Sequence, residues 1–427
     1  MNSPALHKTI GLGFLATLGV VPLVQIALEV GRGQWPLALD LFEQKPTVSH
    51  LRAYDRALEE SNWLGANLRP WTQHALWTLF RDAGSKALVG RDGWLFYRPG
   101  VQFLTHRPKP GPGSGTASEA AAAIAHFRDQ LADRGATLLV VPVPNKESIY
   151  PEKLSRRAVR TRPGVGPETS ELMERLKAAG IETVDLFSAF GRAKSAEAAP
   201  GPALYLARDT HWSPAGVELA ARTVAARVFE LGQIQMGSVA YGLRPASVQR
   251  VGDLLQMLQV PSIERAAAPE TVPCTQVVRA DTNELYQDDP EAPVLVLGDS
   301  FLRIYEQDEP QAAGFVAHLA RELQQPVVSL VSDGGASTLV RQELNLRPAL
   351  LKNKKLVIWE FTERDIRLGT EGWQKVPVPG TSPQIGHMRD ERTAPHEADA
   401  GPSDARLTVG RFFPRTSKQA HRTARPF

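Results

Sequence analysis

The sequence predicts a three-layer α/β sandwich with a parallel sheet, preceded by a transmembrane helix. Two observations support this fold class. Short apolar runs of strand length alternate with helical segments, which is typical of a parallel sheet with helices on both faces. Two of these runs, 136–144 and 294–298, are almost entirely apolar, as expected for strands that are buried on both sides. The chain of 427 residues is long enough for one large or two ordinary domains.

The N-terminal segment 10–28, IGLGFLATLGVVPLVQIAL, carries no charge. At a rise of about 1.5 Å per residue it just crosses a hydrocarbon core of about 30 Å. Lys8 before it favours a cytoplasmic N-terminus, and no clear A-x-A cleavage site follows. We therefore expect residues 1–31 to form a cytoplasmic N-terminus and a membrane anchor. A cleaved signal peptide and a buried helix of a soluble protein remain open.

Residues 32–84 are predicted to be a helical lead-in. A turn at Asp92-Gly93 leads into a strand over residues 94–97. A loop rich in Pro and Gly follows at 107–117, and then an Ala-rich helix that Gly135 ends.

The main alternation begins after residue 135. Strands are predicted at 136–144, 181–187, 294–298, 326–331 and 355–361, and helices at 168–179, 214–231, 312–325 and 336–351. Residues 232–290 are poorly patterned, and we expect an insertion with its own small strands. The domain is predicted to span 85–376. The tail 377–427 is rich in Pro, Gly and charge and is predicted to be disordered.

Composition excludes several function classes. The net charge of +3 is too balanced to indicate nucleic-acid binding, and no basic patch is interleaved with aromatic residues. Cys274 is the only cysteine, so neither an intrachain disulfide nor a cysteine-based metal cluster can form. We expect no metal and no cofactor.

Two motifs carry candidate chemistry. Ser300 follows the predicted strand 294–298 within GDS, at the carboxyl end where functional groups of parallel sheets gather. In RDTHWSPAG, Asp209 and His211 project to the same side of an extended segment, and Ser213-Pro214 is a good helix start. Asp209 can therefore orient His211, which can act as the base for a Ser300 nucleophile.

Alternatives remain for each motif taken singly. A serine in GDS can be an ordinary turn residue, and Asp-x-His can be a capped loop or a pair of metal ligands. No third or fourth ligand is apparent, because the other candidate histidines lie in ordinary helical or loop contexts: His106, His126 and His318.

Four motifs together resemble the alginate O-acetyltransferase family of SGNH hydrolase-like proteins. They are DGWLFY (92–97), VPVPNKESIYPEKL (141–154), DTHW (209–212) and GDSF (298–301). The resemblance runs from about residue 85 to 370. It implies a permuted SGNH hydrolase-like fold and transfer of an acyl group, usually acetyl, to a hydroxyl of an exopolysaccharide. It carries over Ser300, His211 and Asp209 as the catalytic triad.

The resemblance also implies a location and a partner. The expected protein is a single-pass protein of the inner membrane with its catalytic domain in the periplasm. A multi-pass membrane O-acyltransferase would supply the acyl group, because the family works where no acetyl-CoA exists. The tail is too short for the C-terminal carbohydrate-binding domain that some members carry.

The remaining site residues follow from the same resemblance. Gly334 or Gly335 in VSDGGAS is a candidate oxyanion donor, with a flexible turn as the alternative. The asparagine expected after KLVIWEF is absent. Arg364 is the candidate replacement, or it pairs with Glu360 at i, i+4 on a helix. Asn145 and Lys146 belong to a family motif, but the sequence assigns them no chemistry.

Two tryptophans are candidates for contact with sugar rings. Trp212 lies beside His211, and Trp359 lies in the last predicted strand. Ordinary core packing is the alternative for both. Two other functions remain open: a carbohydrate esterase or deacetylase that uses the same triad with water as acceptor, and a non-catalytic scaffold of a polysaccharide export complex.

Overall fold

The computed structural model describes residues 4–43, 54, 57–58, 61–106, 116–158, 164–195 and 202–378. The predicted tail therefore lies outside the described residues from 379 onwards, as does the loop segment 107–115.

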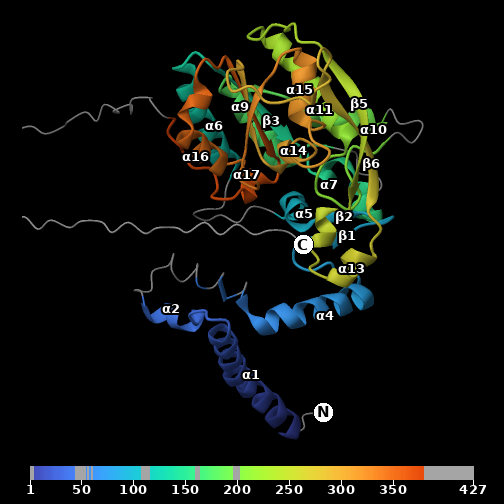
Figure 1. The fold of residues 1–427 in the computed structure, drawn as a ribbon, viewed down its shortest axis with the longest axis vertical. Coiled ribbons are helices and arrows are strands. Elements are labelled where there is room, and N and C mark those ends of the chain that lie inside the picture. Colours follow the sequence, from blue (N-terminus) through green and yellow to red (C-terminus); the bar gives the residue numbers. More distant parts are fainter. Residues whose placement is uncertain are drawn as a thin grey trace, which may run out of the picture. The chain divides into compact units, whose positions relative to one another are not determined.

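A five-stranded parallel sheet forms the centre of the structure, in the order β4-β3-β9-β7-β8 (Figure 1). The strands are β3 (Thr137–Val143), β4 (Glu182–Thr183), β7 (Val294–Gly298), β8 (Val328–Val331) and β9 (Leu356–Thr362). Every residue of β7 and β9 is buried. The run of β7 is apolar throughout, as expected for a strand covered on both faces, whereas β9 also buries Glu360 and Thr362. The predicted α/β fold with a parallel sheet is confirmed.

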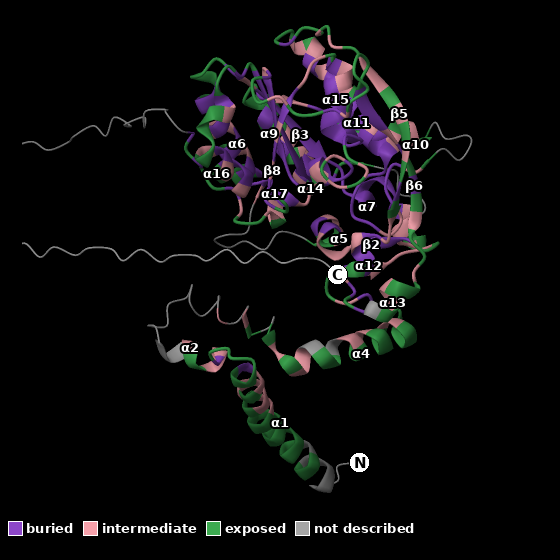
Figure 2. Cartoon of the chain, in the orientation of Figure 1, coloured by how far each residue is buried: buried purple, intermediate pink, exposed green. Residues whose placement is uncertain are grey.

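Helices cover both faces of the sheet. The helices α6 (Ala117–Ala132), α9 (Pro167–Ala178) and α16 (Leu339–Leu346) pack on one face, and α10 (Leu186–Ser195), α11 (Pro214–Leu231) and α15 (Phe315–Leu323) on the other. Along β7, Val294 and Val296 belong to one core, whereas Leu295 and Leu297 belong to the other. Successive side chains of a strand point to opposite faces, so this alternation shows that β7 is buried on both faces. The buried residues, purple in Figure 2, fill the central layers of the domain.

One predicted strand is much shorter than expected. The strand expected over 181–187 is only Glu182–Thr183, because helix α10 begins at Leu186. Asp185 provides the reason: its carboxylate accepts the main-chain N–H of Ser188 at 2.9 Å, as an N-cap residue does.

Several smaller elements connect the strands and the longer helices. Those between residues 87 and 158 are β1 (Ala87–Val89), β2 (Leu95–Tyr97), α5 (Arg98–Thr105), α7 (Lys146–Ile149), α8 (Pro151–Leu154) and the 3-10 turn η1 (Arg156–Ala158). The region 232–290 contains an antiparallel pair, β5 (Tyr241–Arg250) and β6 (Glu270–Arg279), with α12 (Asp253–Gln256) and α13 (Pro261–Ala266) between them. The remaining short elements are α14 (Ser300–Arg303), η2 (Pro348–Leu351) and α17 (Asp365–Leu368).

Among the described residues, the helices α1 (Pro4–Gly31), α2 (Leu37–Glu43) and α4 (Trp63–Phe80) precede β1. Among the described residues, Gly11–Gly31 is a stretch long and apolar enough to cross a membrane, and none of its most hydrophobic window is buried. A signal anchor and a signal peptide both agree with this finding.

Candidate active site

Ser300 lies at the carboxyl end of β7 and is the first residue of α14. Asp299 caps this short helix, because its side chain accepts the N–H of Phe301 at 2.9 Å. Gly298 leaves room for a side chain of β9: a Cβ at this position would lie 2.3 Å from Oε2 of Glu360. Gly298 and Asp299 therefore have structural roles in this turn.

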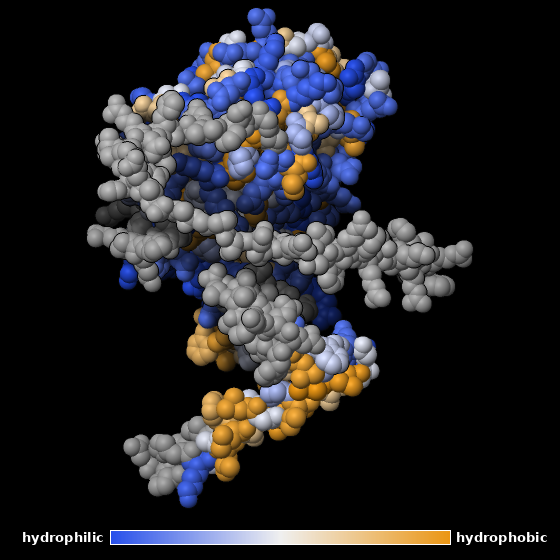
Figure 3. Space-filling model, turned by 90° about the vertical axis from the view of Figure 1, so that its left-hand side faces the viewer, coloured by the Kyte–Doolittle hydropathy of each residue, from blue (hydrophilic) through white to orange (hydrophobic). Residues whose placement is uncertain are grey.

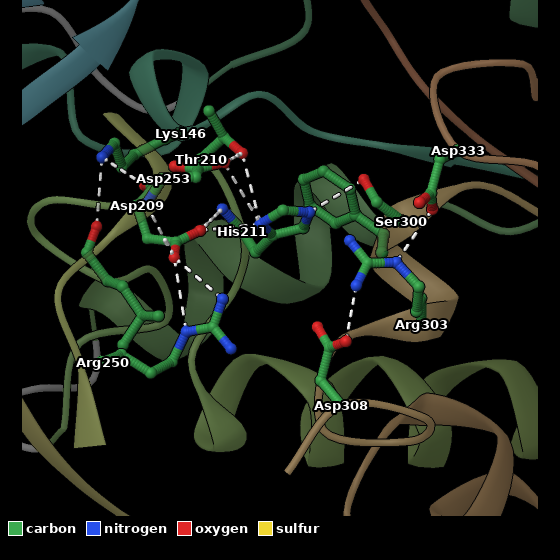
Figure 4. A network of polar contacts seen from close by, with 12 residues as sticks. Lys146, Asp209, Thr210, His211, Arg250, Asp253, Ser300, Arg303, Asp308 and Asp333 are labelled. Carbon is green, nitrogen blue, oxygen red and sulfur yellow. Dashed lines mark hydrogen bonds and ion pairs between the residues drawn. The ribbon is translucent and has the colours of Figure 1, made fainter. Parts of the chain in front are cut away.

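His211 and Asp209 lie on the loop that leads into α11. His211 Nε2 is 2.8 Å from Ser300 Oγ, and His211 Nδ1 is 2.7 Å from Asp209 Oδ1. Figure 4 shows the imidazole between the two partners. Ser213 caps α11 by accepting the N–H of Gly216, which fixes the end of the loop as its Ser-Pro start predicts. The structure therefore brings together the three residues that the sequence proposed as a triad.

Arg250, at the end of β5, holds the other oxygen of Asp209. Its Nη2 and Nε lie 3.1 and 3.3 Å from Asp209 Oδ2. Burial by itself raises the pKa of Asp209, but the neighbouring His211 and the Arg250 guanidinium overcome it and hold that pKa well below its usual range. Asp209 is therefore a carboxylate at neutral pH.

A second carboxylate, Asp253, faces the same imidazole. Its Oδ2 lies 3.5 Å from His211 Nδ1, and its Oδ1 accepts the N–H of Thr210 at 2.7 Å. Burial tends to lower the pKa of His211, but the charges of Asp209 and Asp253 raise it above the ordinary value. The site thus favours the imidazolium form that a general base takes on when it accepts a proton.

A third possible metal ligand, which was not apparent from the sequence, lies beside the Asp209–His211 pair. Ligand atoms of Asp209, His211 and Asp253 lie within 4.8 Å of one another. The Arg250 guanidinium on Asp209 opposes a divalent cation there by charge repulsion, so the arrangement fits an acid–base site better than a metal centre.

Lys146 holds the backbone of the histidine loop and is almost fully buried. Its Nζ donates to the carbonyl oxygens of Leu206, Ala207 and Asp209, at 3.1, 3.2 and 2.7 Å. The ammonium also lies over the rings of Trp94 and Phe96, 5.6 and 5.1 Å from their centroids. Lys146, which belongs to VPVPNKESIYPEKL, thereby contacts two other motifs recognised in the sequence, DGWLFY and DTHW.

A cavity of about 410 Å³ opens beside Ser300. Its lining includes His211, Tyr97, Gly334 and Arg364. Gly334 lies in the left-handed region, at φ 63°. The N–H of Gly335 donates to Ser332 O at 2.9 Å within the turn, so Gly335 is not the oxyanion donor that the sequence allowed.

An ion pair connects the loop that carries Gly334 to α14. Arg303 Nε donates to Asp333 Oδ1 at 2.9 Å, and Arg303 also pairs with Asp308 (Figure 4). The ion pair between Arg303 and Asp333, the residue before Gly334, therefore holds Gly334 near Ser300.

Arg364 is half-buried and lines this cavity. Its guanidinium lies 5.3 Å from the ring centroid of Tyr97, and its Nη1 donates to Asn145 Oδ1 at 3.3 Å. The predicted helical pairing with Glu360 is wrong, because Glu360 lies in β9 and its Oε2 accepts the N–H of Asp299. Arg364 thus stays available to the cavity as a cationic donor.

Neither tryptophan lines the cavity, so the predicted contact of both with sugar rings is wrong. Trp212 is fully buried and packs against Phe301 and Phe315, with ring centroids 5.2 and 5.8 Å away. Trp359 is also fully buried, and its Nε1 donates to Ala336 O at 2.8 Å. Core packing explains both residues. The aromatic residue at the cavity is Tyr97.

Comparison with known proteins identifies the family. Residues 87–363 match the family described as "SGNH hydrolase-like domain, acetyltransferase AlgX". The chain belongs to this family. The resemblance predicted from the four motifs is thereby confirmed.

Individual relatives agree with this assignment. Over 323 residues the chain is 25% identical to a protein of Pseudomonas aeruginosa named "Probable alginate O-acetylase AlgJ", covering 72% of this chain and 76% of that protein. The protein of the same name from Pseudomonas putida is 26% identical over 359 residues, 79% of this chain and 87% of the relative. The solved O-acetyltransferase domain of P. putida AlgJ superposes with a TM-score of 0.53 at 24% identity, covering 67% of this chain and 94% of that domain, and shows the same fold.

Sequence reasoning about this AlgX-family chain missed Arg250, Asp253 and the role of Lys146. The first two lie in the region 232–290, where no strong periodicity marks a functional segment. Gly252 between them has φ 95°, and a Cβ there would lie 2.3 Å from Arg208 O. The position of Arg250 and Asp253 in the site therefore depends on the close approach of Gly252 to the loop that carries His211.

Asp253→Asn is expected to shift the pH dependence of kcat/KM. Removing the anion lowers the pKa of His211, so the neutral base persists to lower pH and the acidic limb moves down. The substituted amide can still accept the Thr210 N–H, which preserves the loop. The pH profile of acetyl release from an ester substrate measures this shift. Asp281→Asn, at an exposed ion pair with Arg279, serves as the control. An unmoved acidic limb would contradict the electrostatic role of Asp253.

Lys146→Met is expected to lower the free energy of unfolding by about 2–4 kcal/mol, because buried carbonyl groups lose a charged donor. Activity of the folded variant should fall as well, since the Asp209 backbone loses its support. Urea denaturation and kcat measure the two effects. Lys354→Met removes another buried lysine, which donates to Pro290 O at 2.7 Å, and should lower stability alone. Equal kcat in both variants would refute the positioning role of Lys146.

Proposed function

We propose that the protein is an extracytoplasmic O-acetyltransferase that moves an acetyl group through an acyl-Ser300 intermediate onto hydroxyls of an exopolysaccharide. The observation that carries the proposal is the continuous hydrogen-bond chain from Asp209 through His211 to Ser300. The names of the relatives point to alginate or a similar polymer as the acceptor.

The first half of the reaction acylates the serine. Ser300 Oγ attacks the carbonyl carbon of the donor ester while His211 Nε2 takes the hydroxyl proton. Asp209 holds Nδ1 and stabilises the imidazolium. The oxyanion forms next to the N–H of Ser300, which has no intrahelical acceptor at the start of α14. Gly334 and Arg364 lie at the same cavity and are candidates for further donors. The imidazolium then protonates the leaving alkoxide.

The second half reverses the roles of the partners. A sugar hydroxyl takes the place of the leaving group, His211 removes its proton, and the hydroxyl oxygen attacks the acyl carbonyl. Collapse of the tetrahedral intermediate breaks the bond to Ser300 Oγ, which recovers its proton from His211. A water molecule in the same place would give acetate, which is the esterase reaction.

The apolar helix supports a membrane location. As an uncleaved anchor, Gly11–Gly31 would hold the enzyme in the inner membrane with its catalytic domain in the periplasm. Acetyl groups would reach it there through a multi-pass membrane O-acyltransferase.

The proposal is tested with the full chain in detergent, an acetyl-donor ester and oligosaccharide acceptors. Mass spectrometry counts acetylated oligosaccharide against free acetate. The expected result is acetylated sugar as a major product, because a site adapted to a sugar hydroxyl keeps water out of competition. Rapid acetate release without acetylated sugar, across several acceptor polymers, would instead support a carbohydrate esterase.

The location has its own prediction. Alkaline phosphatase fused after Asp40 should be active in cells, because that reporter folds only outside the cytoplasm. The same fusion without residues 4–31 serves as the control and should be inactive. An inactive fusion with the intact helix would overturn the periplasmic location.

A further inference from the structure

Helix α4 presents an apolar stripe to the outside. Its members recur every three or four residues and so lie on one helical face: Leu64, Leu68, Trp71, Ala75 and Leu79. Trp71 and Leu79 are 76% and 72% exposed, and Phe80 at the end of the helix is 73% exposed. Large exposed side chains in such an array are rare on a soluble monomer and mark a contact surface.

The opposite face of α4 is the one that meets the α/β domain. His74 Nδ1 is 3.1 Å from Ser262 Oγ in α13. Trp77 lines a groove together with Leu255 and Ile263. The domain therefore occupies one side of the helix and leaves the apolar stripe uncovered.

The start of α4 is bonded to the apolar helix α1. Gln25 Nε2 donates to Ser61 O at 3.0 Å, and its Oε1 accepts the N–H of Trp63 at 2.7 Å. Gln25 lies within Gly11–Gly31, near its C-terminal end. These bonds place the beginning of α4 beside the last turns of the segment that can cross a membrane.

Composition points to lipid as the material that covers the stripe. Residues 61–81 contain no Asp or Glu, whereas they contain Arg69 and Arg81. Cationic residues suit anionic headgroups, and tryptophans are enriched at the membrane–water boundary. Figure 3 shows hydrophobic side chains gathered on α1 and α4, whereas the α/β domain presents mostly hydrophilic surface.

We propose that α4 lies in the interface of the membrane that α1 crosses, with the stripe of Leu64, Leu68, Trp71, Ala75 and Leu79 against the lipid. This inference rests on the membrane location within the proposed function. A helix with Trp and Leu on one face and with basic residues but no acidic ones elsewhere can bind in this way, in the plane of the boundary instead of across the bilayer. It would hold the catalytic domain at the surface of the same membrane that contains the acyl donor.

The experiment uses single cysteines in the full chain, with Cys274 replaced by Ala. Leu68→Cys and Leu79→Cys carry the environment-sensitive fluorophore NBD on the stripe. The matched control is Leu346→Cys, because Leu346 is a leucine of α16 that is 82% exposed. The labelled proteins are reconstituted into vesicles of phosphatidylethanolamine and phosphatidylglycerol. Some vesicles contain lipids with a nitroxide quencher near the headgroup, and others have it deep in the acyl chain.

Both stripe labels are expected to lose roughly half of their emission to the shallow quencher, and less to the deep one, since an interfacial helix enters only the outer acyl region. The Leu346→Cys label should be unquenched. Stripe emission that no lipid quencher changes would overturn the inference, whether the label is in water or is shielded by another protein. Fluorescence is read without acetyl transfer, so an inactive protein with quenched labels would refute the enzyme proposal alone. An active protein with unquenched labels would refute this inference alone.

Discussion

Ser300→Ala is expected to reduce acetyl transfer by about 10⁵-fold while the protein remains folded. The substitution removes the oxygen that is proposed to form the acyl intermediate, Ser300 Oγ, which His211 Nε2 contacts at 2.8 Å. Little else changes, since the Asp299 cap of α14 bonds to the N–H of Phe301 and does not use the serine hydroxyl. Acetylated oligosaccharide, measured by mass spectrometry, reports the loss.

The same assay supplies the controls. Ser195→Ala, at an exposed serine whose hydroxyl donates to Gly191 O within α10, should leave the rate unchanged. His211→Ala should be about as damaging as Ser300→Ala, since loss of one member of a catalytic unit removes most of what the unit contributes. Full activity of a well-folded Ser300→Ala protein would remove the proposed triad.

Asp209→Asn is expected to lower kcat by about 10⁴-fold, with a much smaller effect on KM. An amide at this position can donate to His211 Nδ1, which would place the imidazole proton on Nε2 and leave the serine without a base. The same change leaves the Arg250 guanidinium beside a neutral group. Steady-state kinetics measure both constants.

Arg250→Gln separates the two effects of the aspartate. It removes the ion pair with Asp209 but keeps the carboxylate on His211, so its loss of kcat should be far smaller than that of Asp209→Asn. An Asp209→Asn enzyme that retains wild-type kcat would show that the Asp209–His211 bond has no catalytic role.

Much of the fold could be predicted from local patterns. VLVLG corresponds residue by residue to β7, because a short apolar run that is rich in Val and ends at a Gly is typical of a strand buried between two layers. Helix α11 begins at Ser213-Pro214 and ends at Gly232, because the residues that satisfy or end a helix act over a few positions. Local patterns failed near Asp185. The apolar residues of 181–187 predicted a longer strand, but the capping bond of Asp185 begins helix α10 at Leu186.

The local sequence is enough to predict that groups close together along the chain, such as Asp209 and His211, also lie close together in the site. Asp209 and His211 are two residues apart, and the end of an extended segment is enough to place them together. Ser300 could be proposed as their partner because GDS follows a buried strand, and the order of motifs indicated the family before any geometry was known.

Packing in the folded chain determines which distant segments meet. Among the described residues β9 is the last strand, and it inserts between β3 and β7, which brings Arg364 and Glu360 near Ser300. From the region around β5 and α12, which has no strong pattern, Arg250 reaches Asp209 and Asp253 reaches His211. Trp212 turns into the core although its neighbour faces the cavity. Such contacts depend on packing between elements far apart in sequence. Hydrophobic periodicity reports whether a residue is buried, and not what it is buried against.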